Sequence, residues 1–272
     1  MTAGVEYWEE LWDAADPNWR DDPPEIIRLQ PGFCDYLLGR KWQLNMIRHS
    51  RVDRLMLLGG QRFGYAYCVT ACARCRACAP ARIRVDTFRF TRSQRRTLRT
   101  NEDLSISVQP VEYTPEKFHL LAKFVETKFG KRTDHLRTEE DRIHYYLSFH
   151  LHHPAHSREI QYRENGRLIG VSIVDFGERG LYSHYFFYDL AERKRRLGIY
   201  SFLREIGWCQ QLGRPYLYIG FLNEKTPALS YKSQFANLEV LRPQLGWAPY
   251  EPLAKPGKLV RSQESSMPLH EG

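Results

Sequence analysis

A cluster of cysteines followed by a basic segment is the feature that most constrains this chain. Four of the six cysteines lie close together, at Cys68, Cys72, Cys75 and Cys78. The segment that follows, up to residue 101, is rich in arginine and contains Asp86 as its only acid. Thiolates favour soft metals or redox chemistry, and clustered arginines favour a polyanion. The combination predicts a thiol site that positions a basic surface.

The spacing of the cysteines suits a shared metal ion. In Cys72-x-x-Cys75-x-x-Cys78, two-residue gaps let successive thiolates turn towards one ion. A structural zinc needs four ligands, and an iron–sulfur cluster uses the same thiolates. We predict Cys72, Cys75 and Cys78 as ligands, with Cys34 as the fourth and Cys68 as its alternative. Unliganded cysteines that pack as small apolar side chains remain open as a second interpretation.

The arginines after the cysteines fall on one face of a predicted helix. Thr91 is a good N-cap, and Arg92, Arg95, Arg96 and Arg99 follow at helical spacing. Four like charges on one stripe repel unless an anion neutralises them. We therefore predict that this stripe contacts RNA phosphates, with a solvated charged face as the alternative.

Composition and charge limit the class of protein. Hydrophobic residues make up 42% of the 272 residues, which excludes global disorder. No apolar run is long enough to cross a membrane, and the first residues are acidic where a signal peptide would be basic. We expect a cytoplasmic protein with no membrane partner. The formal net charge of +8 is compatible with a nucleic-acid partner.

The element pattern predicts an α+β fold. Helices are expected over 115–130, 138–150 and 195–212, with strands on either side of Asn165-Gly166, a strong hairpin dipeptide. A third strand over 181–188 and a later one over 216–220 complete an antiparallel meander, a helix and a strand. That order resembles the middle of a GCN5-related N-acetyltransferase (GNAT) fold.

We expect four segments along the chain. They are an N-terminal helix and linker (1–30), a Cys-rich α/β domain that ends with the basic helix (31–107), a GNAT-like transferase domain (108–250) and a disordered tail (251–272).

One turn bears on the acyl donor. Acetyltransferases hold the pyrophosphate of coenzyme A with an R-x-x-G-x-G/A turn at a helix N-terminus. Here Arg195 and Gly198 match, but the last small residue is replaced by Tyr200. A bulky ring there is expected to fill the floor of the pyrophosphate site and obstruct binding of the pyrophosphate. The sequence thus favours another acyl donor.

Several motifs together resemble the aminoacyl-tRNA–protein transferases. The N-terminal ones are C-x-x-C-x-A-C-x-P-x-R from Cys72 to Arg82, the basic run from Phe90 to Arg96, N-x-D-L from Asn101, and the early C-x-Y-L element at Cys34. The bacterial aspartate/glutamate leucyltransferases are the branch that the chain resembles most, and the arginyltransferases are related to it.

The second half matches the same family in order. The matching elements are Tyr185 to Asp189, the R-x-L-G turn at Arg195, Tyr216 to Gly220, Tyr231-Lys232-x-x-Phe235, and Glu239. The resemblance predicts Tyr231, Lys232, Glu239 and Tyr218 as catalytic residues. It predicts substrate binding by Tyr188, Asp189, Arg196, Gly198, Tyr216, Gly220 and Phe235.

The resemblance implies transfer of an amino acid, leucine or arginine, from charged tRNA to a protein N-terminus. Acceptors that begin with Asp or Glu are expected, as in the N-degron pathway of protein degradation. An aminoacyl ester is already activated, so transfer requires no cofactor. The partners are aminoacyl-tRNA and acceptor proteins or peptides with a free N-terminus. The alternatives are a coenzyme A-dependent acyltransferase and a non-catalytic protein of the same fold that binds RNA or senses metal.

Overall fold

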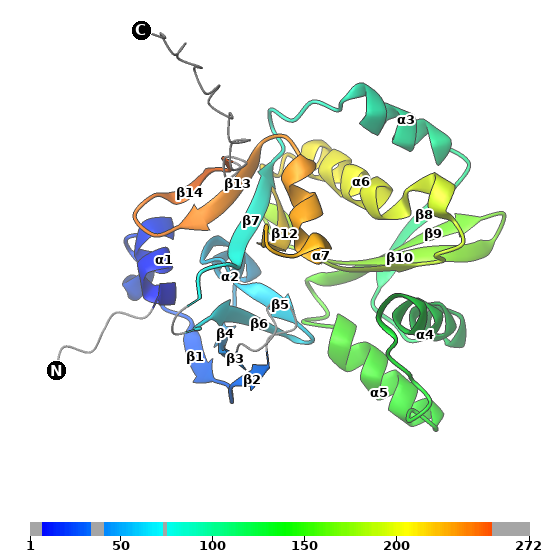
Figure 1. The fold of residues 1–272 in the computed structure, drawn as a ribbon, viewed down its shortest axis with the longest axis horizontal. Helices are drawn as coiled ribbons and strands as arrows, with labels where there is room; N and C mark the ends of the chain where they lie inside the picture. Colours follow the sequence, from blue (N-terminus) through cyan, green and yellow to red (C-terminus); the bar gives the residue numbers. More distant parts are fainter. Residues whose placement is uncertain (1–6, 34–40, 73–74, 252–272) are drawn as a thin grey trace, which may run out of the picture.

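The computed structural model describes residues 7–33, 41–72 and 75–251. Its chain is built on one large sheet and two smaller ones (Figure 1). Cys34, residues 1–6 and the predicted tail beyond residue 251 lie outside the described residues, so the predictions for them stay predictions. In the described part of the chain, no helix is both long enough and apolar enough to cross a membrane.

The N-terminal part forms a small antiparallel sheet covered by a helix. Helix α1 (Tyr7–Ala15) buries Trp8, Leu11 and Trp12. The rings of Trp8 and Trp12 pack edge to face with Trp19. The remaining elements of this part are η1 (Trp19–Asp21), β1 (Glu25–Arg28), β2 (Gly32–Phe33), β3 (Lys41–Trp42), β4 (Leu44–Arg48), α2 (Val52–Leu57), β5 (Gln61–Phe63) and β6 (Ala66–Thr70). The four-stranded sheet has the order β1-β4-β6-β5, and β2 pairs with β3.

The large sheet has eight strands in the order β14-β13-β7-β12-β11-β10-β9-β8. They are β7 (Ala79–Arg84), β8 (Ser105–Pro110), β9 (Ser157–Glu164), β10 (Arg167–Phe176), β11 (Gly180–Tyr188), β12 (Tyr216–Leu222), β13 (Leu238–Arg242) and β14 (Gly246–Pro249). Strands β9, β10 and β11 form an antiparallel meander, and β12 lies parallel to β11. The turn between β9 and β10 has positive φ at Asn165 and Gly166, as a tight hairpin requires.

Helices cover both faces of this sheet (Figure 1). They are α3 (Arg92–Thr100), α4 (Pro115–Phe129), α5 (Glu139–His150), η2 (Arg193–Arg195), α6 (Leu197–Gln211), α7 (Pro227–Ser230) and η3 (Tyr231–Gln234). Helix α6 packs on one face with Leu203 and Ile206, and α3 lies against α6. Helices α4 and α5 cover the other face of β10 and β11 through residues such as Phe124 and Tyr146.

Local signals explain where the helices begin. Thr91 and Thr138 each close a capping box with a side chain three residues later, which satisfies free N–H groups at the helix start. Thr114 caps α4, Pro115 occupies its first position, and Gly130 ends it in the left-handed conformation. These helices lie where the sequence predicted them.

The predicted fold class is confirmed, including the meander, the helix and the strand that follows it. The Cys-rich N-terminal α/β domain is not confirmed. Strand β7, which follows the cysteines, joins the large sheet between β13 and β12, and β8 forms its far edge. The large sheet therefore contains strands from both sides of residue 108, and the division of the chain at that residue stays a prediction.

Candidate active site

A large cavity begins where two parallel strands of the large sheet separate. Strands β11 and β12 pair only through their first three residues, from Gly180 and Tyr216 to Tyr182 and Tyr218. Beyond that point no ladder joins them, and a cavity of about 930 Å³ opens. Its walls come from β5, the end of α4, the end of α5, β11, the turn before α6, the start of α6, β12 and η3.

Lys232 is buried at the point where the strands part. Its Nζ donates hydrogen bonds to the carbonyl oxygens of Ile219 at 2.5 Å and Phe221 at 3.0 Å. Both carbonyls lie in the part of β12 that has left β11. Lys232 thus supplies hydrogen-bond donors to β12 where the pairing of β12 with β11 has ended. Burial lowers the pKa of the Lys232 ammonium to about 7, while its two carbonyl acceptors favour the charged form.

The strand needs a glycine beside this lysine. Gly220 lies between the two carbonyls with φ of 80°, and the register of β12 against β7 shifts between Tyr218 and Phe221. A Cβ at residue 220 would lie 3.2 Å from Lys232 Nζ. Glycine is therefore required here both for the backbone conformation and for the close approach of the ammonium.

The small sheet supplies one wall through β5. Gln61, Arg62 and Phe63 line the cavity. Arg62 forms a fully buried ion pair with Asp175 of β10 at 2.8 Å, and its backbone N–H donates to the hydroxyl of Tyr182 at 3.0 Å. The side chain of Arg62 is thus neutralised, and its role is to fix β5 against the large sheet. A buried pair of this kind is costly to break from one side.

Asp175 is the centre of that connection. Besides Arg62, it accepts hydrogen bonds from Tyr67 at 2.8 Å and from Ser157 at 2.6 Å. Tyr67 belongs to β6 and Ser157 to β9, so one carboxylate joins two strands of the large sheet to the small sheet. The wall at β5 is therefore held by several polar contacts.

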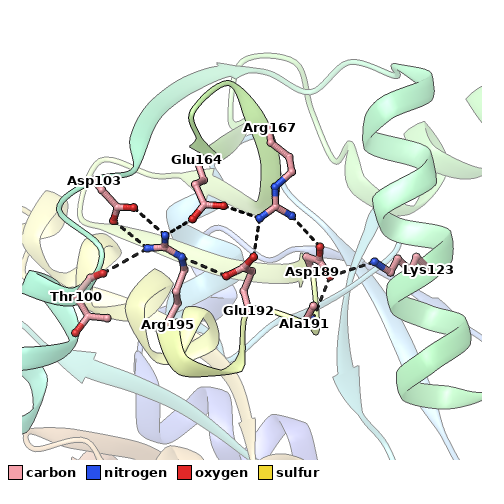
Figure 2. A network of polar contacts seen from close by, with 9 residues as sticks. All are labelled: Thr100, Asp103, Lys123, Glu164, Arg167, Asp189, Ala191, Glu192 and Arg195. Atoms are coloured by element: carbon pink, nitrogen blue, oxygen red, sulfur yellow. Dashed lines mark hydrogen bonds and ion pairs between the residues drawn. The ribbon is translucent and has the colours of Figure 1, made fainter.

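The turn that leads into α6 is held by ion pairs on its outer side (Figure 2). Arg195 contacts Asp103, Glu164 and Glu192. Arg167 contacts Glu164, Glu192 and Asp189, and Asp189 also pairs with Lys123 of α4 at 3.2 Å. These contacts tie the turn to the β9–β10 hairpin, to α4 and to the end of α3.

Arg195 is held by acidic partners on the outer side of the turn, whereas two other arginines of the turn lie at the cavity. Arg193 and Arg196 both line it. Arg196 has a left-handed backbone, and its guanidinium lies 3.3 Å from the hydroxyl oxygens of Ser93 and Thr97 on α3. The basic helix α3 therefore lies directly beside the cavity wall. In the described part of the chain, no carboxylate pairs with Arg193 or Arg196.

The arginine stripe on α3 is exposed as predicted. Its four residues are Arg92, Arg95, Arg96 and Arg99. No ion pair joins any of them to an acid within the described residues, although Arg95 donates to the carbonyl of Phe90. The stripe is thus available to an anionic partner, and its binding to tRNA stays a prediction.

Six of the predicted site residues line the cavity: Tyr188, Arg196, Gly198, Gly220, Tyr231 and Lys232. Two others do not line it. Asp189 belongs to the ion-pair network and to an adjoining cavity of about 240 Å³, and Phe235 packs in the core against Phe202.

The remaining three gather around another arginine. Arg82 of β7 pairs with Glu239 at 2.7 Å, lies over the ring of Tyr216 at 3.7 Å, and approaches the hydroxyl of Tyr218 at 3.4 Å. None of the three is among the residues that line the cavity. Their predicted catalytic or binding roles stay predictions.

The cysteines do not converge in the described structure. Cys72 accepts a hydrogen bond from the backbone of Gln43, and Cys78 accepts one from Asn223 at 3.5 Å. Among the described residues, no three Cys, His, Asp or Glu side chains lie close enough to hold a metal ion. Cys72, Cys75 and Cys78 therefore do not form the predicted shared site by themselves. Cys34 lies outside the described residues.

The expectation for Tyr200 is wrong. The sequence predicts that Tyr200 fills the place where an acetyltransferase holds the pyrophosphate. Instead its ring packs on Tyr162, its hydroxyl donates to the carbonyl of Asn101, and it is not among the residues that line the cavity. Helical periodicity explains this, because a residue two positions after Gly198 turns towards the core. Sequence reasoning also missed the aromatic wall from α4 and α5, which includes Phe124 and Phe149. Both lie in predicted helices, and only the packing shows which face they present.

Comparison with known proteins establishes the family. Residues 32–96 match the description "Arginine-tRNA-protein transferase, N terminus", and residues 116–242 match "Arginine-tRNA-protein transferase, C terminus". This chain belongs to the arginine-tRNA-protein transferase family. It is therefore a transferase, as the sequence predicted, and both halves of the cavity wall come from the matched regions.

Relatives within this family carry a more specific name. An aspartate/glutamate leucyltransferase of Nitrosococcus oceani is 38% identical over 192 residues, which cover 70% of this chain and 79% of that protein. One from Saccharophagus degradans is 33% identical and covers 79% of this chain and 93% of its own. A solved tandem GNAT protein from the clavulanic acid pathway is 9% identical, with a TM-score of 0.40, over 87% of this chain and 64% of its own. A score this low does not by itself establish a shared fold.

The burial of Lys232 is open to a direct test with Lys232→Met. Its folded pKa, about 7, lies below the usual value of 10.5, so between these values the unfolded chain binds a proton that the folded chain does not. The free energy of unfolding of the wild type should therefore rise with pH relative to that of the variant, by about 1.4 kcal/mol per pH unit from roughly pH 7.5 to 9.5. Urea unfolding at several pH values measures this. The exposed Lys194→Met is the matched control and should show no such trend, and parallel curves for wild type and Lys232→Met would contradict the burial.

Proposed function

We propose that this enzyme transfers a leucyl group from tRNA to the N-terminal amine of proteins that begin with Asp or Glu. The observation that carries the proposal is the cavity between β11 and β12, with the ammonium of Lys232 buried at its base and Arg196 at its wall. The names of the relatives supply the donor and acceptor classes. The product would carry a new N-terminal leucine, which suits a role in N-degron recognition.

The surroundings of the cavity suit the 3′ end of tRNA. Phe63, Phe129 and Tyr231 line it and are 40%, 50% and 41% exposed. Exposed rings provide stacking platforms for unpaired bases, and arginines neutralise the phosphates between them. Arg196 contacts Ser93 and Thr97 of α3, the helix that carries the arginine stripe. The proposal therefore places the acceptor stem on α3 and the terminal nucleotides at the aromatic rim.

The cavity favours a leucyl over an arginyl donor. A guanidinium in a low-dielectric site needs a carboxylate partner. Glu192 is the only acid among the described residues that line the cavity, and it is already paired with Arg167 at 2.6 Å and Arg195 at 3.3 Å. The aromatic wall from Phe124, Phe149 and their neighbours offers an apolar surface instead. Leucine gains from that surface without leaving a charge unpaired.

The charge of the lining also matches the proposed acceptor. Within the described residues, the cationic side chains at the cavity that lack a carboxylate partner include Lys128, Arg193 and Arg196. A positive field there attracts both RNA phosphates and the side chain of an N-terminal Asp or Glu.

The chemistry then depends mainly on placement and on charge stabilisation. The neutral amine attacks the ester carbonyl, and negative charge develops on the carbonyl oxygen. Lys232 has a pKa of about 7 and is therefore partly protonated near pH 7. In the protonated form it uses two of its three N–H groups on Ile219 and Phe221, so one remains to stabilise that oxyanion. Tyr231, on the same short helix, lines the cavity and can orient the ester by its hydroxyl.

A coenzyme A-dependent reaction is no longer opposed by Tyr200, because that ring turns into the core. The family assignment favours aminoacyl-tRNA in its place. A non-catalytic RNA-binding protein with this fold is the other alternative, and an assay of aminoacyl transfer separates both alternatives from the proposed function.

The decisive assay is transfer of labelled amino acid from charged tRNA to short peptides. Leucyl-tRNA and arginyl-tRNA should each be tested with peptides that begin with Asp, Glu, Ala or Lys. We expect leucine transfer to the Asp and Glu peptides and little from arginyl-tRNA, because no described residue that lines the cavity offers a free carboxylate. Arginine transfer at an equal or higher rate would contradict the donor assignment, and tRNA binding without any transfer would favour the non-catalytic alternative.

Lys232→Ala serves as the site control in this assay. Loss of the ammonium should lower kcat/KM at least tenfold, about 1.4 kcal/mol of transition-state stabilisation. The exposed Lys194→Ala should transfer at the wild-type rate. Equal rates for all three proteins would remove Lys232 from the mechanism.

The arginine stripe gives a second, independent prediction. Replacing its four arginines (Arg92, Arg95, Arg96 and Arg99) by Gln should weaken tRNA binding and flatten its salt dependence. Each lost phosphate contact removes about 0.7–0.9 from the slope of log K against log salt. Filter binding over a range of salt concentrations measures both effects.

The matched control lies in the loop between α4 and α5, far from α3 (Figure 1). Lys131, Arg132 and Arg137 there are basic and should tolerate Gln with no change in slope. If the stripe variant keeps the wild-type affinity and slope, the stripe is a solvated face.

A further inference from the structure

A buried carboxyl group lies beside the cavity and has no role in the mechanism so far. Glu205 of α6 is 0% exposed. Its Oε1 accepts hydrogen bonds from Ser172 of β10 at 2.6 Å and Ser201 of α6 at 3.0 Å. Its Oε2 is buried, and no described residue reaches it with normal hydrogen-bond geometry. An unpaired carboxylate oxygen in the core costs free energy, so its presence calls for a reason.

The position of Glu205 connects it to the cavity through a third serine. Ser183 of β11 lines the cavity, and its hydroxyl interacts with the Glu205 carboxyl. Ser183 lies just beyond Tyr182, the last residue of β11 that pairs with β12. The hydroxyl thus stands between the buried carboxyl and the space where the strands have separated.

From this geometry we infer that Glu205 accepts, through Ser183, the proton that the acceptor's α-ammonium must lose before it attacks. The inference rests on the proposed function and adds a residue to it. Glu205 does not line the cavity, so it is a positioning and proton-accepting residue that acts through the serine.

The proton and electron balance is simple. The ammonium gives one proton to Ser183 Oγ, whose own proton passes to the Glu205 carboxylate. The freed amine lone pair forms the C–N bond, the ester C–O bond breaks, and the ribose oxygen leaves with a second proton from the nitrogen. Glu205 later releases its proton to water. One ammonium and one ester thus become one amide, one hydroxyl and one free proton.

The electrostatics suit this role. Burial raises the pKa of Glu205, although the three serine hydroxyls oppose the rise, and this brings the carboxyl closer to the pH at which the enzyme works. The ionisable groups that feel its charge are Tyr162 of β9, Cys209 of α6 and Tyr231 of η3, whose pKa values it helps to raise. Each of them is neutral near pH 7, so none competes for the proton.

The test is the pH dependence of leucine transfer by Glu205→Gln. An α-amine has a pKa of about 7.7–8.0, so at pH 6.5 nearly all of it needs deprotonation, and at pH 8.5 most is already neutral. In single-turnover assays with leucyl-tRNA and an Asp-initiated peptide, the variant should be at least tenfold slower than wild type at pH 6.5. It should come within about threefold at pH 8.5, because solvent then supplies the neutral amine.

Two further variants distinguish loss of the proton relay from a folding defect. Ser183→Ala removes the relay while it leaves the carboxyl in place, and it should reproduce the pH-dependent loss. Ser172→Ala removes one of the two hydrogen bonds to Glu205 Oε1 but leaves Ser183 in place, and its profile should keep the wild-type shape. A loss by the same factor at every pH in Glu205→Gln and Ser183→Ala would show a structural role and overturn the inference.

The outcomes also separate this inference from the proposed function. If wild type transfers leucine but the two variants keep its pH profile, only the inference fails. If wild type transfers from neither leucyl-tRNA nor arginyl-tRNA, the proposed function fails, and the inference falls with it.

Discussion

The separation of β11 from β12 is the feature on which the rest of the site depends. Parallel strands that stop pairing leave backbone carbonyls without partners, and such groups must be satisfied elsewhere. Lys232 satisfies two of them by donating to Ile219 and Phe221, and Gly220 provides the backbone conformation that aligns them. The same lysine therefore stabilises the opening and places a positive charge in it. Structure and proposed chemistry share one residue here.

Polar contacts between distant parts of the chain hold the walls of the opening in place. The buried pair of Arg62 with Asp175 holds β5 against the meander. On the other side, Arg167 and Arg195 fix the turn before α6 from outside (Figure 2). Placement of two large substrates requires that neither wall move, because catalysis by proximity loses its effect when the reacting groups are misaligned.

The sequence predicted those features that depend on neighbouring residues. Capping threonines, the Asn165-Gly166 turn and helical spacing located the helices and the meander, and the motifs led to the family. The sequence did not predict features that depend on pairing between residues far apart in the chain. Strand β7 joins β12 and β13, more than 130 residues away, and no local pattern indicates that. The same limit explains why the sequence did not indicate that Tyr218 and Glu239 lie beside Arg82. It also explains why the proposed role of Glu205 could be inferred only from the structure, in which three serines from separate elements surround its carboxyl group.

The most direct test of the account is the structure of the enzyme with a stable donor analogue. In a CCA trinucleotide whose terminal adenosine carries leucine through a 3′-amide, the ester oxygen is replaced by nitrogen and transfer is blocked. We expect the leucyl carbonyl oxygen to lie between β11 and β12, within about 3.2 Å of Lys232 Nζ. We also expect the leucine side chain to contact the aromatic wall near Phe124. An analogue bound elsewhere, with the space between the two strands empty, would contradict the central claim.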